Sequence, residues 1–257
     1  FADKNFSNDI KMSGVNSINW ARIISQSVYY FYSYFLMEDD NRPINFSVPT
    51  GNFGDVYAGY LAKKMGLPIN KLIVATNQND ILYRAISNGG YEVENVFETL
   101  SPSMDIQVAS NFERLLYDLN EGDDFQTIDA MKSIKEKGKY IINQEKLDKI
   151  NVNFLSSRIR EEEVLKTINE VYKKFSVILD PHSAIGYGAF DKTNLDGNNI
   201  VLATAHPCKF PDAIKSAINI KAELPNELQF ILNEKENYDI LENDIEKVKE
   251  HIKDRSK

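Results

Sequence analysis

The sequence predicts an α/β protein with an open, mostly parallel twisted sheet covered by helices. Short strands are expected at four places, over residues 44–48, 71–75, 176–179 and 199–203, and the one at 71–75 is continuously apolar, as expected of a parallel strand covered on both faces. Segments with the 3.6-residue apolar period of helices separate these strands. With 257 residues, the chain is also long enough to bury the core of one large domain.

The clearest alternation of helices and strands lies in the first half of the chain. Helices are expected there over residues 15–37, 56–65, 80–87 and 111–119. Asn16 or Ser17 is expected to cap the first helix, and the sequence GLP at 66–68 should end the second. The order strand, helix, strand, helix implies right-handed crossovers between parallel strands.

The second half is more charged. Residues 123–169 are mostly helical in pattern, and the tail over 233–257 is charged and amphipathic, as expected of a surface helix. Between the two strands expected in this half, the segment DPHSAIG at 180–186 is typical of a turn that enters a helix. Asp180 would be its N-cap and Gly186 a helix-packing position.

Composition argues against several classes of protein. The formal charge is −8, whereas nucleic-acid binding needs a cationic surface. No apolar run approaches the roughly 18 to 20 residues of a membrane helix. Cys208 is the single cysteine, which suits a reducing cytoplasm. The three histidines have neither HxH nor HxxxH spacing, so no metal site is expected.

The loop PTGNFGD at 49–55 is the first candidate site. Gly51 and Gly54 would let the backbone turn sharply and approach a ligand without a Cβ clash. The helix that follows offers free N–H groups and a positive dipole end, which favour a phosphate. A plain strand-to-helix turn explains the two glycines equally well. The position at the carboxyl end of a strand favours ligand binding.

Three further segments allow both a functional and a structural interpretation. The hydroxyl of Thr204, before His206-Pro207, could bond a ring nitrogen, although a simple cap at the strand end is favoured on these residues alone. Asp180 and His182 suggest acid–base chemistry, but an N-cap explains them better. The turn SPSMD at 101–105 could bind an anion or be a capped loop, and its spacing does not decide.

Taken together and in order, these segments resemble one family, threonine synthase. The resemblance runs from near the first residue to about Ile214. The matching stretches are VNSINWARI (15–23), VPTGNFGDVYAGYLAKKMGLPI (48–69), KLIVATNQNDIL (71–82), LSPSMDI (100–106), SNFERLL (110–116), LDPHSAIG (179–186) and LATAHPCKFPDAI (202–214). It implies fold type II of the enzymes that use pyridoxal 5′-phosphate (PLP), the tryptophan synthase β-like fold.

The resemblance assigns roles to residues. In this family the glycine-rich loop holds the cofactor phosphate, and the threonine of the LATAHP motif lies beside the pyridine nitrogen. The implied cofactor-binding residues are therefore Gly51, Asn52, Phe53, Gly54, Asp55 and Thr204. Segments bordering the active site supply weaker candidates for substrate binding, namely Asn16, Ser17, Asn19, Arg22, Ser101 and Ser103.

The implied reaction converts O-phospho-L-homoserine and water to L-threonine and phosphate, the last step of threonine biosynthesis. Its Schiff-base lysine belongs to an AFKD-type motif, and an SGDTG-type loop follows that motif in the family. Neither motif occurs in residues 1–257, and Lys209 in HPCKF belongs to a different motif. The chain therefore resembles a C-terminal portion of the enzyme, with no catalytic residue of its own and no expected activity alone.

The resemblance also implies a domain plan. Residues 1–14 would end a preceding small-domain segment, 15–232 would form the large PLP-binding domain, and 233–257 would be a charged helix packed on it. Either a monomer or a homodimer is compatible with the sequence. Two alternatives stay open: a non-catalytic module that binds PLP or phosphate, and a related phospho-lyase with another phosphorylated substrate.

Overall fold

The centre of the fold is a four-stranded parallel sheet, seen in a computed structural model that describes residues 3–37 and 42–256. Its strand order is β5-β2-β1-β6. The strands are β1 (Ile44–Pro49), β2 (Ile69–Thr76), β5 (Phe154–Arg158) and β6 (Asn198–Val201). All three pairings are parallel, so the predicted α/β fold is confirmed. A small antiparallel sheet pairs β3 (Gly90–Glu92) with β4 (Lys139–Ile141).

Helices flank the sheet and extend beyond it. The α-helices are α1 (Lys4–Asp9), α2 (Trp20–Phe35), α3 (Gly54–Lys64), α4 (Ile81–Asn88), α5 (Phe112–Leu119), α6 (Asp124–Lys137), α7 (Gln144–Asn153), α8 (Glu161–Phe175), α9 (Pro181–Thr193), α10 (Pro211–Ile218) and α11 (Ile245–Arg255). Short 3₁₀ segments are η1 (Pro102–Met104), η2 (Pro207–Lys209) and η3 (Asn226–Asn233). None of the helices among the described residues is long and apolar enough to cross a membrane.

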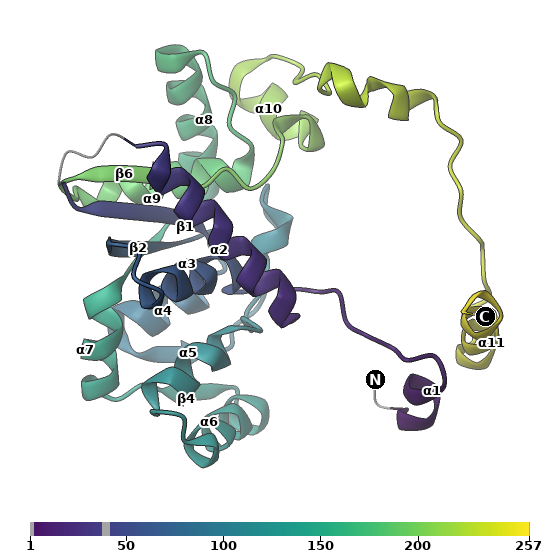
Figure 1. The fold of residues 1–257 in the computed structure, drawn as a ribbon. Coiled ribbons are helices and arrows are strands. Elements are labelled where there is room, and N and C mark those ends of the chain that lie inside the picture. Colours follow the sequence, from purple (N-terminus) through teal and green to yellow (C-terminus); the bar gives the residue numbers. More distant parts are fainter. Residues whose placement is uncertain (1–2, 38–41, 257) are drawn as a thin grey trace. The chain divides into compact units, whose positions relative to one another are not determined.

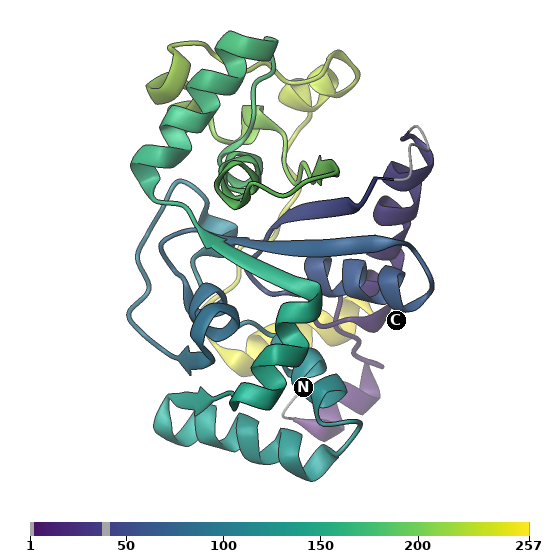
Figure 2. The ribbon, with the colours of Figure 1, turned by 90° about the vertical axis from the view of Figure 1, so that its left-hand side faces the viewer.

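Strand β2 shows why its sequence is continuously apolar. Leu72 and Val74 point into one cluster of buried residues, which includes side chains of α3 and α4. Ile73 and Ala75 point into a second cluster, with side chains of α8, α9 and α10. Successive side chains alternate between the faces of a strand, so both faces of the sheet are covered by helices, as Figures 1 and 2 show.

The connection pattern reverses between β1 and β6. From β1 the chain passes through α3 to β2, on one side of β1. Strand β6 lies on the other side of β1, and α9, which precedes it, covers the opposite face from α3. The register pairs Ser47 with Val201. The carboxyl ends of β1 and β6 therefore meet at a topological switch point, where open α/β sheets bind ligands.

Several predicted elements were wrong. Residues 176–179 form no strand, because Ser176 ends α8 in the left-handed conformation and irregular backbone then leads to Asp180. Strand β5 lies in the stretch expected to be mostly helical. Its polar sequence does not indicate a strand, and its pairing with β2 stabilises it as one. Asn19, and not Asn16 or Ser17, caps α2. In the tail only α11 is α-helical, so the expected helix is shorter.

The chain divides into two compact units. One is residues 17–223, and the other combines the described parts of Phe1–Asn16 and Leu224–Lys257. Within the second unit, Lys249 Nζ lies 2.9 Å from Asp3 Oδ2 and Lys253 Nζ lies 3.1 Å from Asp9 Oδ2. Both ammonium groups lie over the Phe6 ring. The packing of 233–257 on the large domain stays a prediction.

Candidate functional site

The sharp turn of the 51–54 loop is made by Phe53 and not by the glycines. Phe53 has φ 63° and ψ 6°, the left-handed conformation that costs a non-glycine residue about 1–2 kcal/mol. Its ring is fully buried, 5.3 Å from the Phe112 ring and 5.8 Å from the Phe154 ring. Any contact of Phe53 with a ligand in the loop must therefore come from its backbone.

The two glycines provide space for neighbouring parts of the chain. A Cβ on Gly51 would lie 2.8 Å from the carbonyl oxygen of Ser103 and 3.2 Å from Met104 Cα. A Cβ on Gly54 would lie 3.2 Å from Ile23 Cδ1. Neither glycine has the positive φ that only glycine adopts freely. Close packing against the SPSMD turn and α2 therefore explains why glycine stands at these positions.

Asn52 ties the loop to the start of α5. Its carbonyl oxygen accepts hydrogen bonds from the backbone N–H of Asn111 and from Asn111 Nδ2, both at 3.1 Å. Its Oδ1 accepts from Ser110 Oγ at 3.2 Å. Ser17 joins this cluster, because its Oγ lies 3.3 Å from Ser110 Oγ and its carbonyl accepts from Asn111 Nδ2 at 2.9 Å. The predicted candidate Ser17 thus lies beside the loop.

The N-terminus of α3 is suited to an anion. Its N-cap, Phe53, makes no side-chain capping hydrogen bond. The first turn of a helix leaves backbone N–H groups without helical partners and carries a partial positive charge. These groups point toward the end of β1, beside the switch point. This helix terminus is therefore suited to a phosphate group.

Asp55 lies in the first turn of α3 and is tied to α2. The Tyr30 hydroxyl donates to the Asp55 carbonyl oxygen at 2.8 Å and to Oδ1 at 3.0 Å. Burial raises the pKa of Asp55 to about 6, although the hydrogen bond from Tyr30 acts in the opposite direction. Burial also raises the pKa of the Tyr30 hydroxyl well above its usual value. Asp55 therefore carries less negative charge near neutral pH than an exposed aspartate.

Thr204 follows β6 at the same edge of the sheet. Its side chain is exposed, and its backbone N–H donates to Ser183 Oγ at 3.2 Å. Thr204 and Asp55 line one cavity of about 530 Å³, which is within the usual size range of small-molecule sites. The cavity is lined by Gln26, Tyr29, Tyr32, Ser33, Asp55, Ile200, Val201, Leu202, Ala203 and Thr204. The structure thus brings two of the predicted cofactor residues together.

The DPHS segment has the predicted capping geometry. The Asp180 carboxylate accepts from the backbone N–H groups of His182 and Ser183, and α9 begins with Pro181. A Cβ on Gly186 would lie 3.1 Å from Pro49, which confirms the helix-packing glycine. His182 Nδ1 lies 2.9 Å from Asp180 Oδ1, while His182 Nε2 is buried with no hydrogen-bond partner among the described residues.

The remaining predicted residues have different surroundings. Ser101 is fully buried, and its hydroxyl bonds to Asn77 and Thr99, so these contacts hold the SPSMD turn together. Ser103 is exposed, and Arg22 is exposed on α2. The side chain of Asn19 accepts from the Ala21 N–H at 2.9 Å. Asn16 lies outside the unit that contains the loop. A role of these residues in substrate binding stays a prediction.

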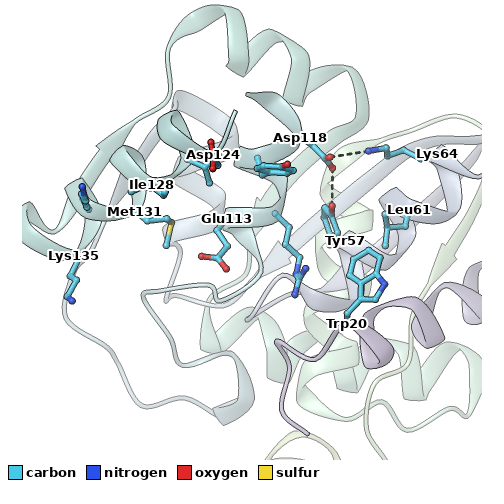
Figure 3. Close-up of a pocket in the computed structure, with 14 residues that line it drawn as sticks. Trp20, Tyr57, Leu61, Lys64, Glu113, Asp118, Asp124, Ile128, Met131 and Lys135 are labelled. Carbon is cyan, nitrogen blue, oxygen red and sulfur yellow. Dashed lines mark hydrogen bonds and ion pairs between the residues drawn. The ribbon is translucent and has the colours of Figure 1, made fainter. Parts of the chain in front are cut away.

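A larger cavity of about 760 Å³ lies between α2, α3, α5 and α6, away from the predicted residues (Figure 3). Asp118 accepts a hydrogen bond from the Tyr57 hydroxyl at 3.0 Å and pairs with Lys64 at 3.1 Å. Arg114 lies over the Trp20 ring, 5.3 Å from its centroid. Apolar side chains such as Leu61, Ile128 and Met131 complete the lining together with charged residues.

Ser110 and Asn111, which begin the matching stretch SNFERLL but received no role in the sequence analysis, are important to the loop. Asn111 is fully buried and bonds both Asn52 and Ser17, and Ser110 joins the same cluster. Asn111 stands at the expected start of a helix, where an N-cap would be the ordinary interpretation. Its side chain makes no capping bond in the structure. No sequence signal distinguishes this long-range role.

Known proteins match the whole chain. The family model described as "Threonine synthase, C-terminal" matches residues 183–252. The threonine synthase of Pseudomonas aeruginosa is 42% identical over 98% of this chain and 54% of its own length. The enzyme of Saccharomyces cerevisiae is 41% identical over 99% of this chain and 55% of its own length. A solved structure of PLP-bound threonine synthase from Brucella melitensis is 44% identical, with a TM-score of 0.96 over 100% of this chain and 55% of that one.

These matches identify both the structural class of the chain and its protein family. The fold is that of the fold type II enzymes that depend on PLP, as the sequence predicted. The chain belongs to the threonine synthase family and corresponds to a C-terminal portion of it. It spans about half the length of the relatives it matches.

Proposed function

We propose that the protein to which this chain belongs is a threonine synthase that converts O-phospho-L-homoserine and water to L-threonine and phosphate with PLP. The observation that supports the site is that Asp55, in the first turn of α3, and Thr204, after β6, line one cavity beside the switch point between β1 and β6. The names of relatives that are 41–42% identical support the reaction. The same names support a role in threonine biosynthesis. A location in the cytoplasm is proposed from the single cysteine, Cys208.

The residues present fit PLP. The uncapped N-terminus of α3 suits the cofactor phosphate, with the N–H groups of residues 51–54 as donors. The exposed Thr204, which lines a cavity of about 530 Å³, suits the ring nitrogen. Asp55 lines the same cavity, and its raised pKa reduces repulsion of a nearby phosphate. The three features lie on one edge of one sheet, as a single bound cofactor requires.

Each group has a distinct chemical role. PLP, when bound, withdraws electrons from the substrate so that protons can leave its carbon atoms. The helix terminus fixes the phosphate end and thereby orients the ring. The Thr204 hydroxyl offers a neutral hydrogen bond to the ring nitrogen, whereas a carboxylate there would favour a protonated nitrogen. This chain therefore binds, orients and tunes the cofactor.

The base that moves protons is expected elsewhere. In this proposal the Schiff-base lysine lies in the part of the relatives' length that this chain does not span. Lys209 is exposed in η2 and has no place in the proposed site. The candidates for substrate binding are proposed to act only in the full-length protein, where the rest of the active site is present. They are Asn16, Ser17, Asn19, Arg22, Ser101 and Ser103.

The proposal is tested with the full-length protein. We expect equal amounts of phosphate and threonine from O-phosphohomoserine, and far slower phosphate release from phosphothreonine. A preference for phosphothreonine would instead support a related phospho-lyase. A full-length protein that binds PLP but releases phosphate from neither substrate would support a non-catalytic module.

A further inference from the structure

We propose that Ser183, held by the buried carboxylate of Asp180, is a positioning residue that sets the place of Thr204 against the cofactor ring. The inference rests on the proposed role of Thr204 in binding the ring nitrogen. Ser183 itself does not touch the cofactor in this proposal. It acts through the backbone N–H of Thr204, which donates to Ser183 Oγ at 3.2 Å.

The direction of the hydrogen bonds in this chain of groups is fixed by chemistry. An ionised carboxylate only accepts hydrogen bonds, so the Ser183 hydroxyl must donate its proton to Asp180 Oδ2. The lone pairs of Ser183 Oγ are then available to the N–H of Thr204. Asp180, Ser183 and Thr204 therefore form one polarised series, in which each bond strengthens the next.

The carboxylate of Asp180, at which this series of hydrogen bonds begins, is held in a fixed position. It is 1% exposed and accepts from His182 N at 2.9 Å, His182 Nδ1 at 2.9 Å and Ser183 N at 3.3 Å, in addition to the hydroxyl. Burial alone would raise the pKa of Asp180, but the hydrogen bonds from His182 and Ser183 outweigh it and hold the pKa below its usual value. The carboxylate is therefore charged and fixed at neutral pH.

The geometry joins two segments that are 21 residues apart. Ser183 belongs to α9, which packs on the sheet, whereas Thr204 lies in irregular backbone after β6. The last sheet-type bond before Thr204 is donated by Leu202 N to Ser47 O at 3.0 Å. The hydrogen bond to Ser183 thus fixes the backbone two residues beyond Leu202, at Thr204, the residue proposed to contact the cofactor.

A purely structural N-cap is the competing explanation, and Ser47 provides a matched control for it. Ser47 and Ser183 are both 2% exposed, and the Ser47 hydroxyl also makes a buried bond to α9, to the Gly186 carbonyl at 2.6 Å. Among the described residues, that hydroxyl makes no hydrogen bond to Thr204. Loss of either hydroxyl should affect folding, whereas only loss of the Ser183 hydroxyl should affect the cofactor ring.

The experiment uses the full-length protein with Ser183→Ala, Ser183→Thr, Ser47→Ala and Thr204→Val. PLP is titrated into each apoprotein, the absorbance maximum of bound PLP is recorded, and urea unfolding is measured without PLP. We expect Ser183→Ala to weaken PLP binding by roughly tenfold and to shift the absorbance maximum in the same direction as Thr204→Val. Ser183→Thr, which keeps the hydroxyl, should stay within about twofold of wild type, as should Ser47→Ala.

Two results would overturn different claims. If Thr204→Val weakens PLP binding while Ser183→Ala behaves like Ser47→Ala, the positioning role of Ser183 is wrong and the proposed site survives. If Thr204→Val leaves both the affinity and the absorbance maximum unchanged, the proposed contact of Thr204 fails, and the inference fails with it. Equal effects of Ser183→Ala and Ser183→Thr on affinity would also count against a role of the hydroxyl.

Discussion

The loop after β1 and the segment after β6 lie at the same edge of one sheet, yet they are held in place by different forces. The loop is fixed by packing as well as by hydrogen bonds from Ser110 and Asn111 to Asn52: the Phe53 ring is buried in an aromatic cluster, and Gly51 lies against the backbone of Ser103. The segment is fixed by single hydrogen bonds, from Leu202 N to Ser47 O and from Thr204 N to Ser183 Oγ.

This difference predicts where folding and ligand binding are coupled. A change in the loop disturbs the hydrophobic core, so it should alter the free energy of unfolding before it alters any ligand contact. A change at the exposed Thr204 removes no packing, so it should alter ligand binding alone. The following predictions test this contrast, from the largest expected effect to the smallest.

Phe53→Ala should have the largest effect on stability. It removes a fully buried ring that contacts Phe112 and Phe154, while alanine keeps the left-handed strain. We expect the free energy of unfolding to fall by about 3–5 kcal/mol in urea titrations. Phe175→Ala, at a ring that is half exposed, is the control and should change it by less than about 1 kcal/mol. A loss below about 1 kcal/mol for Phe53→Ala would contradict the claim that packing of the Phe53 ring holds the loop in place.

Asp55 should make stability depend on pH. Burial raises its pKa from an ordinary value of 3.8 to about 6 in the folded protein, so the folded state holds the proton more tightly than the unfolded state. The penalty of ionising it is absent below pH 3.8, grows as the pH rises and is complete above about pH 6. The shift corresponds to about 3 kcal/mol of lost stability.

The measurement compares wild type with Asp55→Asn, which keeps an oxygen for the Tyr30 hydroxyl. Urea unfolding between pH 4.5 and 7.5 should show the wild type losing stability relative to the variant as the pH rises. A constant difference between the two proteins over this range would show that the pKa of Asp55 is not raised.

Two alanine variants, Gly51→Ala and Gly54→Ala, compare a methyl group that clashes with backbone with one that clashes with a side chain. The new methyl at position 51 meets a backbone carbonyl, which cannot move away, and should lower the free energy of unfolding by about 1–3 kcal/mol. At position 54 it meets the tip of Ile23, which can rotate, so a loss below about 1 kcal/mol is expected. Urea unfolding followed by circular dichroism would measure the free energy of unfolding of both variants. Equal losses of unfolding free energy in the two variants would mean that the backbone of the SPSMD turn moves to make room for the methyl group at position 51.

Thr204→Val should have the smallest effect on stability. The side chain is exposed and similar in shape to valine, so a change within about 0.5 kcal/mol is expected. The same urea measurement, made without PLP, checks this. A larger loss would show that the segment after β6 is part of the folding core, and the contrast with the loop would disappear.

The sheet was predictable where short apolar or alternating segments are bounded by turn residues. Strand β2 contains the continuous run LIVA, β1 (INFSVP) alternates apolar and polar residues, and β6 ends in Ile200-Val201. Strand β5, with the sequence FLSSR, has no such run and depends on β2 for its structure. The segment SVIL at 176–179 was misleading because three apolar residues without a neighbouring strand do not form one.

The site was predictable in part, for a similar reason. The position of the loop and of Thr204 at strand ends follows from the sequence, because parallel strands present their carboxyl ends together. The left-handed Phe53 was not predictable, since the two glycines beside it are the usual sign of such a conformation. The bond from Thr204 to Ser183 joins residues 21 positions apart and leaves no local pattern.

The partnership of β1 with β6 also affects how the protein is made. Ile44 pairs with Asn198, so about 150 residues must be synthesised between the two halves of this contact. At the usual ribosomal speed this takes roughly 8 to 30 s. During that interval β1 can pair only with β2, and the edge where the carboxyl ends of β1 and β6 meet does not yet exist. Long-range pairing of this kind slows folding, so the nascent chain is expected to depend on chaperones until β6 emerges.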